Sequence, residues 1–126
     1  MKRKKPSEQI PPMELAIMNI LWDNGSSSVQ EVQGKLAGKS AYTTVQTTLN
    51  TMEKKGRTKR TLQGRAYVYK AAISREIAMK SAVRDLVDRM FSGSVESLMM
   101  NLVKAENINE ATFERLRKVI ASREEA

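Results

Sequence analysis

Apolar residues recur at the spacing of amphipathic helices over the first 55 residues. A first helix is predicted to begin at Pro11-Pro12, because proline at a helix start lacks only an N–H that would have no partner there. Asp23-Asn24-Gly25 ends this helix. Trp22, near its end, is expected to be a core residue. Ser26-Ser27 is expected to form a short linker or a short edge strand.

Two further helices carry cap signals at their starts. Ser28 and Glu31 match a capping box for a helix that runs to about residue 36. Ser40 is expected to cap a third helix that reaches about residue 55. The residues of this third helix that are expected to face inward are Val45, Leu49 and Met52.

The period then changes to that of strands. Residues 57–62 predict a weak strand, Gln63-Gly64 a turn, and residues 65–69 a clear strand rich in aromatic and β-branched side chains. Together they predict a hairpin with a basic tip. Its tyrosines, Tyr67 and Tyr69, are expected to pack rather than to stack on bases.

Helical periodicity returns from residue 73 and continues to the C-terminus. We expect one helix over residues 74–91, a second over 94–106, and a last one capped by Asn109. The fold class is therefore mainly α with a small β-hairpin, a winged helix-turn-helix followed by a helical dimerisation region. The expected domains are a basic flexible tail (1–10), a winged-helix domain (11–72) and a helical dimerisation domain (73–126).

Charge is distributed unevenly between these predicted domains. Residues 1–72 hold 13 Lys and Arg against 5 Asp and Glu, whereas residues 73–126 hold 9 of each, so the net charge of +8 belongs to the first part. A basic module joined to a neutral one indicates a domain that binds a polyanion. No apolar run is long enough for a membrane span, and the expected location is the cytoplasm, with no membrane partner.

Missing residue types narrow the chemistry further. The chain has no Cys and no His, which excludes disulfides, thiol catalysis and the commonest metal ligand and general base. We therefore expect no enzyme activity, no cofactor and no metal.

The outward face of the third helix offers groups that suit the major groove of duplex DNA. Gln46 and Asn50 can pair with the N6/N7 edge of adenine, although such a face is often only solvated. Threonines can bond phosphates or contact a thymine methyl group, and Lys and Arg would meet phosphates. The DNA-binding residues predicted in this way are Ser40, Tyr42, Thr43, Thr44, Gln46, Thr47, Asn50, Lys54, Lys55, Lys59, Arg60 and Arg65, with Arg57 a further phosphate contact.

The C-terminal helices cannot bury their apolar faces well by themselves, because about 50 residues make too small a core. Dimerisation would supply the missing core, and packing as a lid on the winged helix is the alternative. The residues expected at the dimer interface are Leu86, Met90, Phe91, Leu98, Leu102, Phe113, Leu116 and Ile120.

Five segments resemble the penicillinase repressor family, the BlaI/MecI/CopY transcription repressors. They are the first helix over 14–22, the recognition helix over 42–47 with 54–56, the wing strand over 64–69, and the dimerisation segments 89–94 and 98–102. The resemblance covers about residues 10–122. It implies a homodimeric repressor that binds inverted-repeat operators.

The resemblance also implies two routes of induction. Antibiotic-responsive members are cut between an Asn and a Phe after a membrane sensor protease is activated, and the matching pair here is Asn101-Leu102, which keeps only the Asn. Copper-responsive members use a cysteine cluster, which this chain lacks. A further departure is Arg57-Thr58, where the family has an apolar residue. We therefore expect a first wing strand that is short or poorly packed, with Leu62 as its inward residue.

The leading hypothesis is thus a dimeric operator-binding repressor. The alternatives are a winged-helix protein that binds nucleic acid without sequence preference, and a winged-helix adaptor that binds protein.

Overall fold

The computed structural model describes residues 9–106 and 108–125. The chain divides into two compact units between Val83 and Arg84, and each unit is described separately below. Because the division falls inside a helix, the domain boundary expected after residue 72 stays a prediction. The expected basic tail lies almost wholly outside the described residues.

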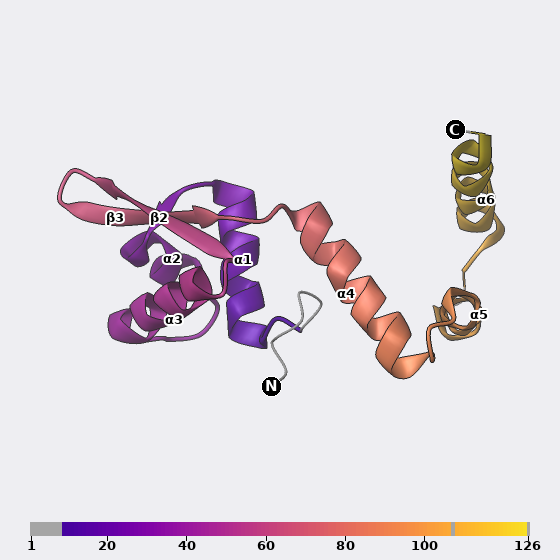
Figure 1. Cartoon of the computed structure of the whole chain (residues 1–126), viewed down its shortest axis with the longest axis horizontal. Helices are drawn as coiled ribbons and strands as arrows, with labels where there is room; N and C mark the ends of the chain where they lie inside the picture. The colour runs from indigo at the N-terminus through magenta and orange to yellow at the C-terminus, as the bar shows by residue number, and fades with distance from the viewer. Residues whose placement is uncertain (1–8, 107, 126) are drawn as a thin grey trace. The chain divides into compact units, whose positions relative to one another are not determined.

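The first unit is a winged helix-turn-helix, which confirms the fold expected from the sequence (Figure 1). Three helices are followed by an antiparallel hairpin, and a two-residue strand ahead of the second helix joins the hairpin to give the strand order β1-β3-β2. The elements are α1 (Pro12–Asn24), β1 (Ser27–Ser28), α2 (Val29–Lys35), α3 (Tyr42–Lys54), β2 (Thr58–Gln63) and β3 (Ala66–Ala71).

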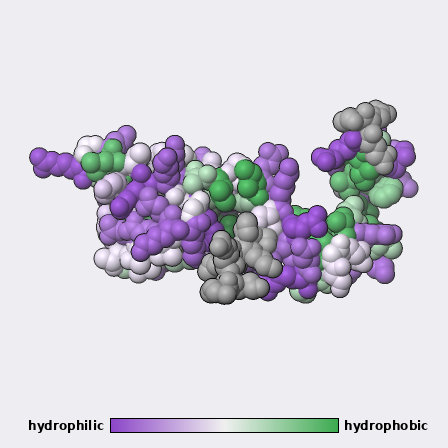
Figure 2. Space-filling view, viewed as in Figure 1, coloured by the Kyte–Doolittle hydropathy of each residue, from purple (hydrophilic) through white to green (hydrophobic). Residues whose placement is uncertain are grey.

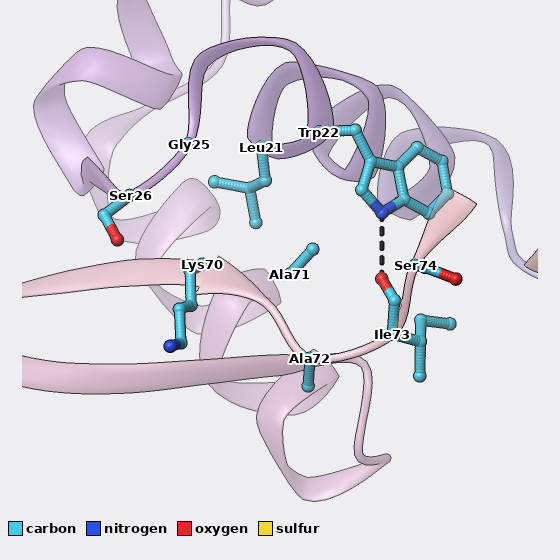
Figure 3. A pocket seen from close by; sticks show the side chains of 9 residues that line it. All are labelled: Leu21, Trp22, Gly25, Ser26, Lys70, Ala71, Ala72, Ile73 and Ser74. Atoms are coloured by element: carbon cyan, nitrogen blue, oxygen red, sulfur yellow. Dashed lines mark hydrogen bonds between the residues drawn. The ribbon is translucent and has the colours of Figure 1, made fainter. Parts of the chain in front are cut away.

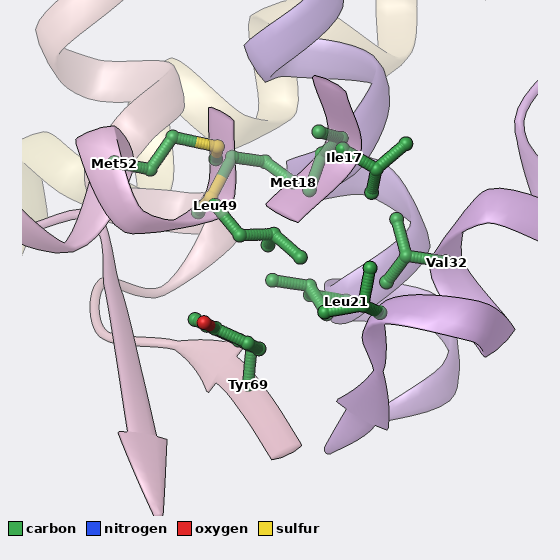
Figure 4. Packing of buried hydrophobic residues seen from close by; sticks show 9 residues of the cluster. Ile17, Met18, Leu21, Val32, Leu49, Met52 and Tyr69 are labelled. Carbon is green, nitrogen blue, oxygen red and sulfur yellow. The ribbon is translucent and has the colours of Figure 1, made fainter. Parts of the chain in front are cut away.

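One core holds these elements together. Each helix contributes residues at helical spacing, and the wing contributes a single large side chain, Tyr69, which is 1% exposed. Figure 4 shows Tyr69 approaching the helix side chains from the sheet. The buried cluster consists of Ile17, Met18, Leu21, Val29, Val32, Val45, Leu49, Met52 and Tyr69.

The cap predicted for α2 is confirmed, and the cap predicted for α3 is wrong. Glu31 N–H donates to Ser28 Oγ at 3.0 Å, and Ser28 N–H donates to the Glu31 carboxylate at 2.8 Å. The residue before α3 is Ala41, which makes no side-chain cap. The Ser40 backbone carbonyl instead accepts from the Gln33 side-chain amide at 2.8 Å, and this hydrogen bond restrains the loop between α2 and α3.

The first wing strand differs from its prediction. β2 has six residues, so it is not short, and Leu62 is 62% exposed rather than inward. The buried residue is Thr58, whose hydroxyl donates to the Leu49 carbonyl at 3.1 Å. The reason is visible in Figure 1, where the hairpin extends past the helices and leaves its distal half with nothing to pack against. As expected, most of β2 is poorly packed.

Contacts around Trp22 fix the chain as it leaves the wing. The indole N–H donates to the Ile73 carbonyl at 2.9 Å, at the rim of a shallow hollow that Figure 3 shows between the end of α1 and β3. Arg75 lies 5.2 Å from the indole ring and pairs with Asp23 at 2.8 Å. These contacts attach the first turn of α4 (Arg75–Met90) to α1.

The remaining helices are α5 (Val95–Glu106) and α6 (Glu110–Glu125). Caps predicted from the sequence are present, since Ile77 N–H donates to Ser74 Oγ and Thr112 N–H donates to Asn109 Oδ1. Ser94 caps α5 in the same way. The helices expected from residue 74 onward are therefore confirmed, with ends shifted by one residue or so.

Candidate nucleic-acid interface

Helix α3 presents a polar face away from the core. Val45, Leu49 and Met52 are buried on one side, which leaves the opposite side to solvent. This exposed face carries hydroxyl, amide and amino groups, and its sequence holds no acidic residue in the first turn. The exposed side chains of α3 are Tyr42, Thr43, Thr44, Gln46, Thr47, Thr51 and Lys54.

The wing supplies basic side chains beside this helix. Lys59 and Lys70 are directly opposite each other in the β2–β3 register, and both are exposed. Arg65 follows Gly64, whose φ of +66° forms the tight turn at the tip. No carboxylate in the described residues pairs with Lys54, Lys59, Arg65 or Lys70. Figure 2 shows this end of the molecule as mostly hydrophilic, with a hydrophilic tip on the hairpin.

A polar network joins α3 to the wing. The Tyr69 hydroxyl lies 2.6 Å from Asn50 Oδ1, and Asn50 is half-buried on the side of α3 that faces the hairpin. Arg60 lies opposite Tyr69 in the register. Its guanidinium lies 4.4 Å from the Tyr67 ring and 3.4 Å from the Glu53 carboxylate. A hydrogen bond with the Tyr69 side chain is the main reason why the pKa of Arg60 is raised above its ordinary value.

A buried carboxylate organises the end of α3. Glu14, 7% exposed, accepts from Lys55 Nζ at 2.9 Å and from the Arg57 guanidinium at 2.8 Å. Both cations therefore pair with a carboxylate of α1, Arg57 at a half-buried position and Lys55 at an exposed one. Both were expected to meet phosphates, which stays a prediction; in the structure each has the Glu14 carboxylate as a partner.

The structure brings most of the predicted DNA-binding residues to one end of the first unit, on α3 and the hairpin. Ser40 and Lys55 are held by contacts within the protein, and Arg60 is partly engaged by Glu53. Sequence reasoning omitted Thr51, although it follows Thr47 by four residues on the same helix and is exposed. It also gave Tyr69 no role at the interface.

The C-terminal helices carry many exposed apolar side chains, and Figure 2 shows hydrophobic residues on α5 and α6. Among the expected interface residues, Phe91 and Leu98 are partly buried and Met90 is 72% exposed. The Asn101-Leu102 pair lies within α5, and Asn101 donates to the Ser97 carbonyl at 3.0 Å. The other exposed members of the expected interface are Leu86, Leu102, Phe113, Leu116 and Ile120.

The described part of the chain offers neither a metal-binding cluster nor a membrane-spanning helix. Residues 9–106 and 108–125 contain no group of three or more His, Cys, Asp or Glu that could hold a metal ion. None of the helices in the same ranges is both long and apolar enough to span a membrane.

Comparison with known proteins decides the class of this interface. The family model described as penicillinase repressor matches residues 10–122. The chain belongs to the penicillinase repressor family. As a member, it is a DNA-binding transcriptional repressor and not an enzyme.

Two sequence relatives agree with this assignment. The penicillinase repressor of Bacillus licheniformis is 25% identical over 118 residues, which cover 92% of this chain and 92% of that protein. The penicillinase repressor of Staphylococcus aureus is 28% identical over 115 residues, which cover 89% and 90%. Among solved structures, a MarR family protein from Bacillus stearothermophilus gives a TM-score of 0.49 at 20% identity, covering 94% of this chain and 78% of that one.

Proposed function

We propose that this penicillinase repressor family member is a homodimer that binds inverted-repeat operator DNA through α3 and the wing. The observation that carries the proposal is the exposed polar face of α3 beside basic side chains of the hairpin that pair with no carboxylate among the described residues. An α-helix fits the major groove, where base edges can be read, and basic side chains meet the flanking phosphates. In this proposal Gln46, Thr43 and Thr47 read bases, and Lys54, Lys59 and Arg65 bind phosphates.

The dimer is supported by the apolar surface of α4, α5 and α6. Each of the three helices carries several large hydrophobic side chains that are at least 39% exposed. Exposed apolar surface on this scale marks an interaction site in a soluble protein. A second copy that covers it by two-fold symmetry would present two α3 helices to DNA, and such a dimer matches a site with dyad symmetry.

The proposal is tested with duplexes selected by the full chain from a random pool. The selected palindrome should bind at least about 10³-fold more tightly than a scrambled duplex at physiological salt. Its affinity should fall steeply as salt rises, because bound phosphates release counterions. Equal affinity for all duplexes would show that the protein binds DNA without sequence preference. Binding that persists at high salt would point to an apolar protein partner instead.

Variants at Gln46 and Lys54 distinguish base recognition from phosphate binding on α3. Gln46→Ala should weaken binding to the selected duplex by about 1–3 kcal/mol and relax the preference at one base pair. Lys54→Ala should weaken the selected and scrambled duplexes alike, since a phosphate contact carries no sequence information. Fluorescence anisotropy with both duplexes measures the difference. Identical behaviour of the two variants would show that α3 does not read bases through Gln46.

A further inference from the structure

The side-chain amide of Asn50 is oriented by the protein itself. Its Oδ1 lies 2.6 Å from the hydroxyl of Tyr69, a residue that is 1% exposed and belongs to the core. The amide oxygen is therefore turned toward the inside of the fold. Its Nδ2 has no partner among the described residues, so the NH₂ group is the part of the amide left for a ligand.

The direction of the hydrogen bond between Tyr69 and Asn50 follows from the chemistry of the two groups. An amide oxygen can only accept, so the Tyr69 hydroxyl donates its single hydrogen to Asn50 Oδ1. Arg60 lies opposite Tyr69 in the β2–β3 register, where Glu53 and the Tyr67 ring contact its guanidinium.

We propose that Tyr69 is a positioning residue that makes Asn50 a donor-only reader of the major groove. Asn50 then donates from Nδ2 to an acceptor on a base edge, which is N7 or O6 of a purine or O4 of thymine. Paired reading of adenine, which the sequence alone suggested, needs the amide oxygen and nitrogen side by side toward the base. With its oxygen turned to a buried hydroxyl, Asn50 does not present that pair.

This inference rests on the proposed function, because it assumes that α3 enters the major groove. Its first test identifies the base pair whose preference disappears in Asn50→Ala, using the duplex selected by the wild-type chain. Both A·T and G·C pairs carry acceptors in the major groove, so the identity of this pair shows which acceptors must be tested. The inference would be overturned if analogues that each lack one of these acceptors all bound like the parent duplex.

Base analogues at that position then separate donor-only reading from paired reading. At a purine, the 7-deaza analogue removes the N7 acceptor, and at a thymine an analogue without O4 removes that acceptor. For guanine, an analogue without O6 is tested as well. Loss of the contacted acceptor should weaken wild-type binding roughly 5- to 100-fold. At adenine, purine nucleoside removes only the N6 donor and should bind like the parent duplex. An equal loss for both changes would establish paired reading and overturn the inference.

Tyr69→Phe tests the positioning role, and Tyr67→Phe is the matched control. Tyr67 lies on the same strand, and its hydroxyl makes no hydrogen bond with the described residues. Tyr69→Phe keeps the ring in the core but frees the Asn50 amide to rotate. It should lower the preference at the Asn50 base pair by roughly 5-fold or more and leave the preferences at other positions intact. Tyr67→Phe should leave them all intact. An unchanged preference in Tyr69→Phe refutes the positioning role.

Asn50→Asp gives a readout that does not depend on any change in the core. The carboxylate still accepts from Tyr69 but replaces the NH₂ group with an acceptor, so preference for an acceptor base should be lost. Retained preference in this variant would contradict donor reading. If the wild-type chain shows no sequence preference, the proposed function fails. If it shows one that Asn50→Ala leaves intact at every position, only this inference fails.

Discussion

At the scale of single residues, the polar groups near α3 divide into those that face solvent and those that hold the fold. Glu14 belongs to the second class, because its carboxylate binds Lys55 from the end of α3 and Arg57 from the start of the wing. One side chain of α1 thereby fixes the point at which α3 ends and the hairpin begins.

Glu14→Gln should destabilise the fold markedly. The change removes a carboxylate that pairs with two cations whose side chains are 29% and 14% exposed. Removal of one partner of a buried ion pair costs about 3–5 kcal/mol, and the partial exposure of Lys55 puts the expected loss at the low end of that range. Urea unfolding followed by circular dichroism measures it.

The matched control is Glu76→Gln, an exposed glutamate in the first turn of α4. It should leave the unfolding midpoint nearly unchanged. Equal midpoints for the two variants would show that the Glu14 cluster contributes nothing to stability.

Local contacts between side chains could be predicted from the sequence, whereas contacts between distant residues could not. The Ser28–Glu31 cap was predictable because its two partners are three residues apart. The Glu14 cluster joins residues 41 and 43 positions apart, and no local pattern encodes that distance. One signal was present, since Glu14 precedes Ile17 by three residues and Met18 by four, which places it on the buried face of α1.

At the scale of elements, the wing is joined to α3 by hydrogen bonds from Thr58 and Tyr69. The order of helices and strands was predictable from periodicity, and so was the buried side of α3. The burial of the hairpin was not, because it depends on how far the strands extend beyond the helices. Leu62 is apolar and stands in a strand, yet it is exposed because no helix covers that part of β2. The link between Asn50 and Tyr69 likewise depends on the packing of β3 against α3.

Arg65→Ala tests the wing as a phosphate-binding element. Arg65 stands at the tip of the hairpin and has no acidic partner in the described residues, so it is free to bind a phosphate. The variant should bind selected and scrambled duplexes more weakly and by the same factor. The slope of log affinity against log salt should decrease in magnitude by about 0.9, the value for one lost phosphate contact.

Lys80→Ala removes an exposed positive charge from α4 and serves as the control for net charge. It should leave the salt slope unchanged. A wing that does not touch DNA would give the same slope in Arg65→Ala as in the wild type.

At the scale of the whole molecule, two kinds of surface belong to different parts of the chain. The excess positive charge is confined to residues 1–72, whereas the helices of the last 50 residues expose hydrophobic side chains. The charge count predicted this contrast from the sequence. How the apolar faces are covered could not be predicted, because in the proposed dimer a single chain contains only one half of the interface.

Leu102→Glu should convert the proposed dimer to monomers. Leu102 is 41% exposed on α5, and a carboxylate there would be buried without a partner in a dimer. Sedimentation equilibrium over a range of protein concentrations measures the dissociation constant. The variant should also lose its advantage for a palindrome over a single half-site.

Lys104→Glu, two residues further along α5, changes the charge at another exposed position and should leave the dimer intact. A Leu102→Glu chain that still sediments as a dimer would place the interface away from α5.

Trp22 gives the chain a built-in optical reporter. It is the only tryptophan, and its indole N–H is bonded to the Ile73 backbone just before α4 begins. Indole emission shifts to longer wavelength as the ring gains contact with water. The fluorescence of the unlabelled protein therefore responds to release of the first turn of α4 from α1, as well as to opening of the core against which Trp22 packs. Stopped-flow mixing with DNA could time such an event directly.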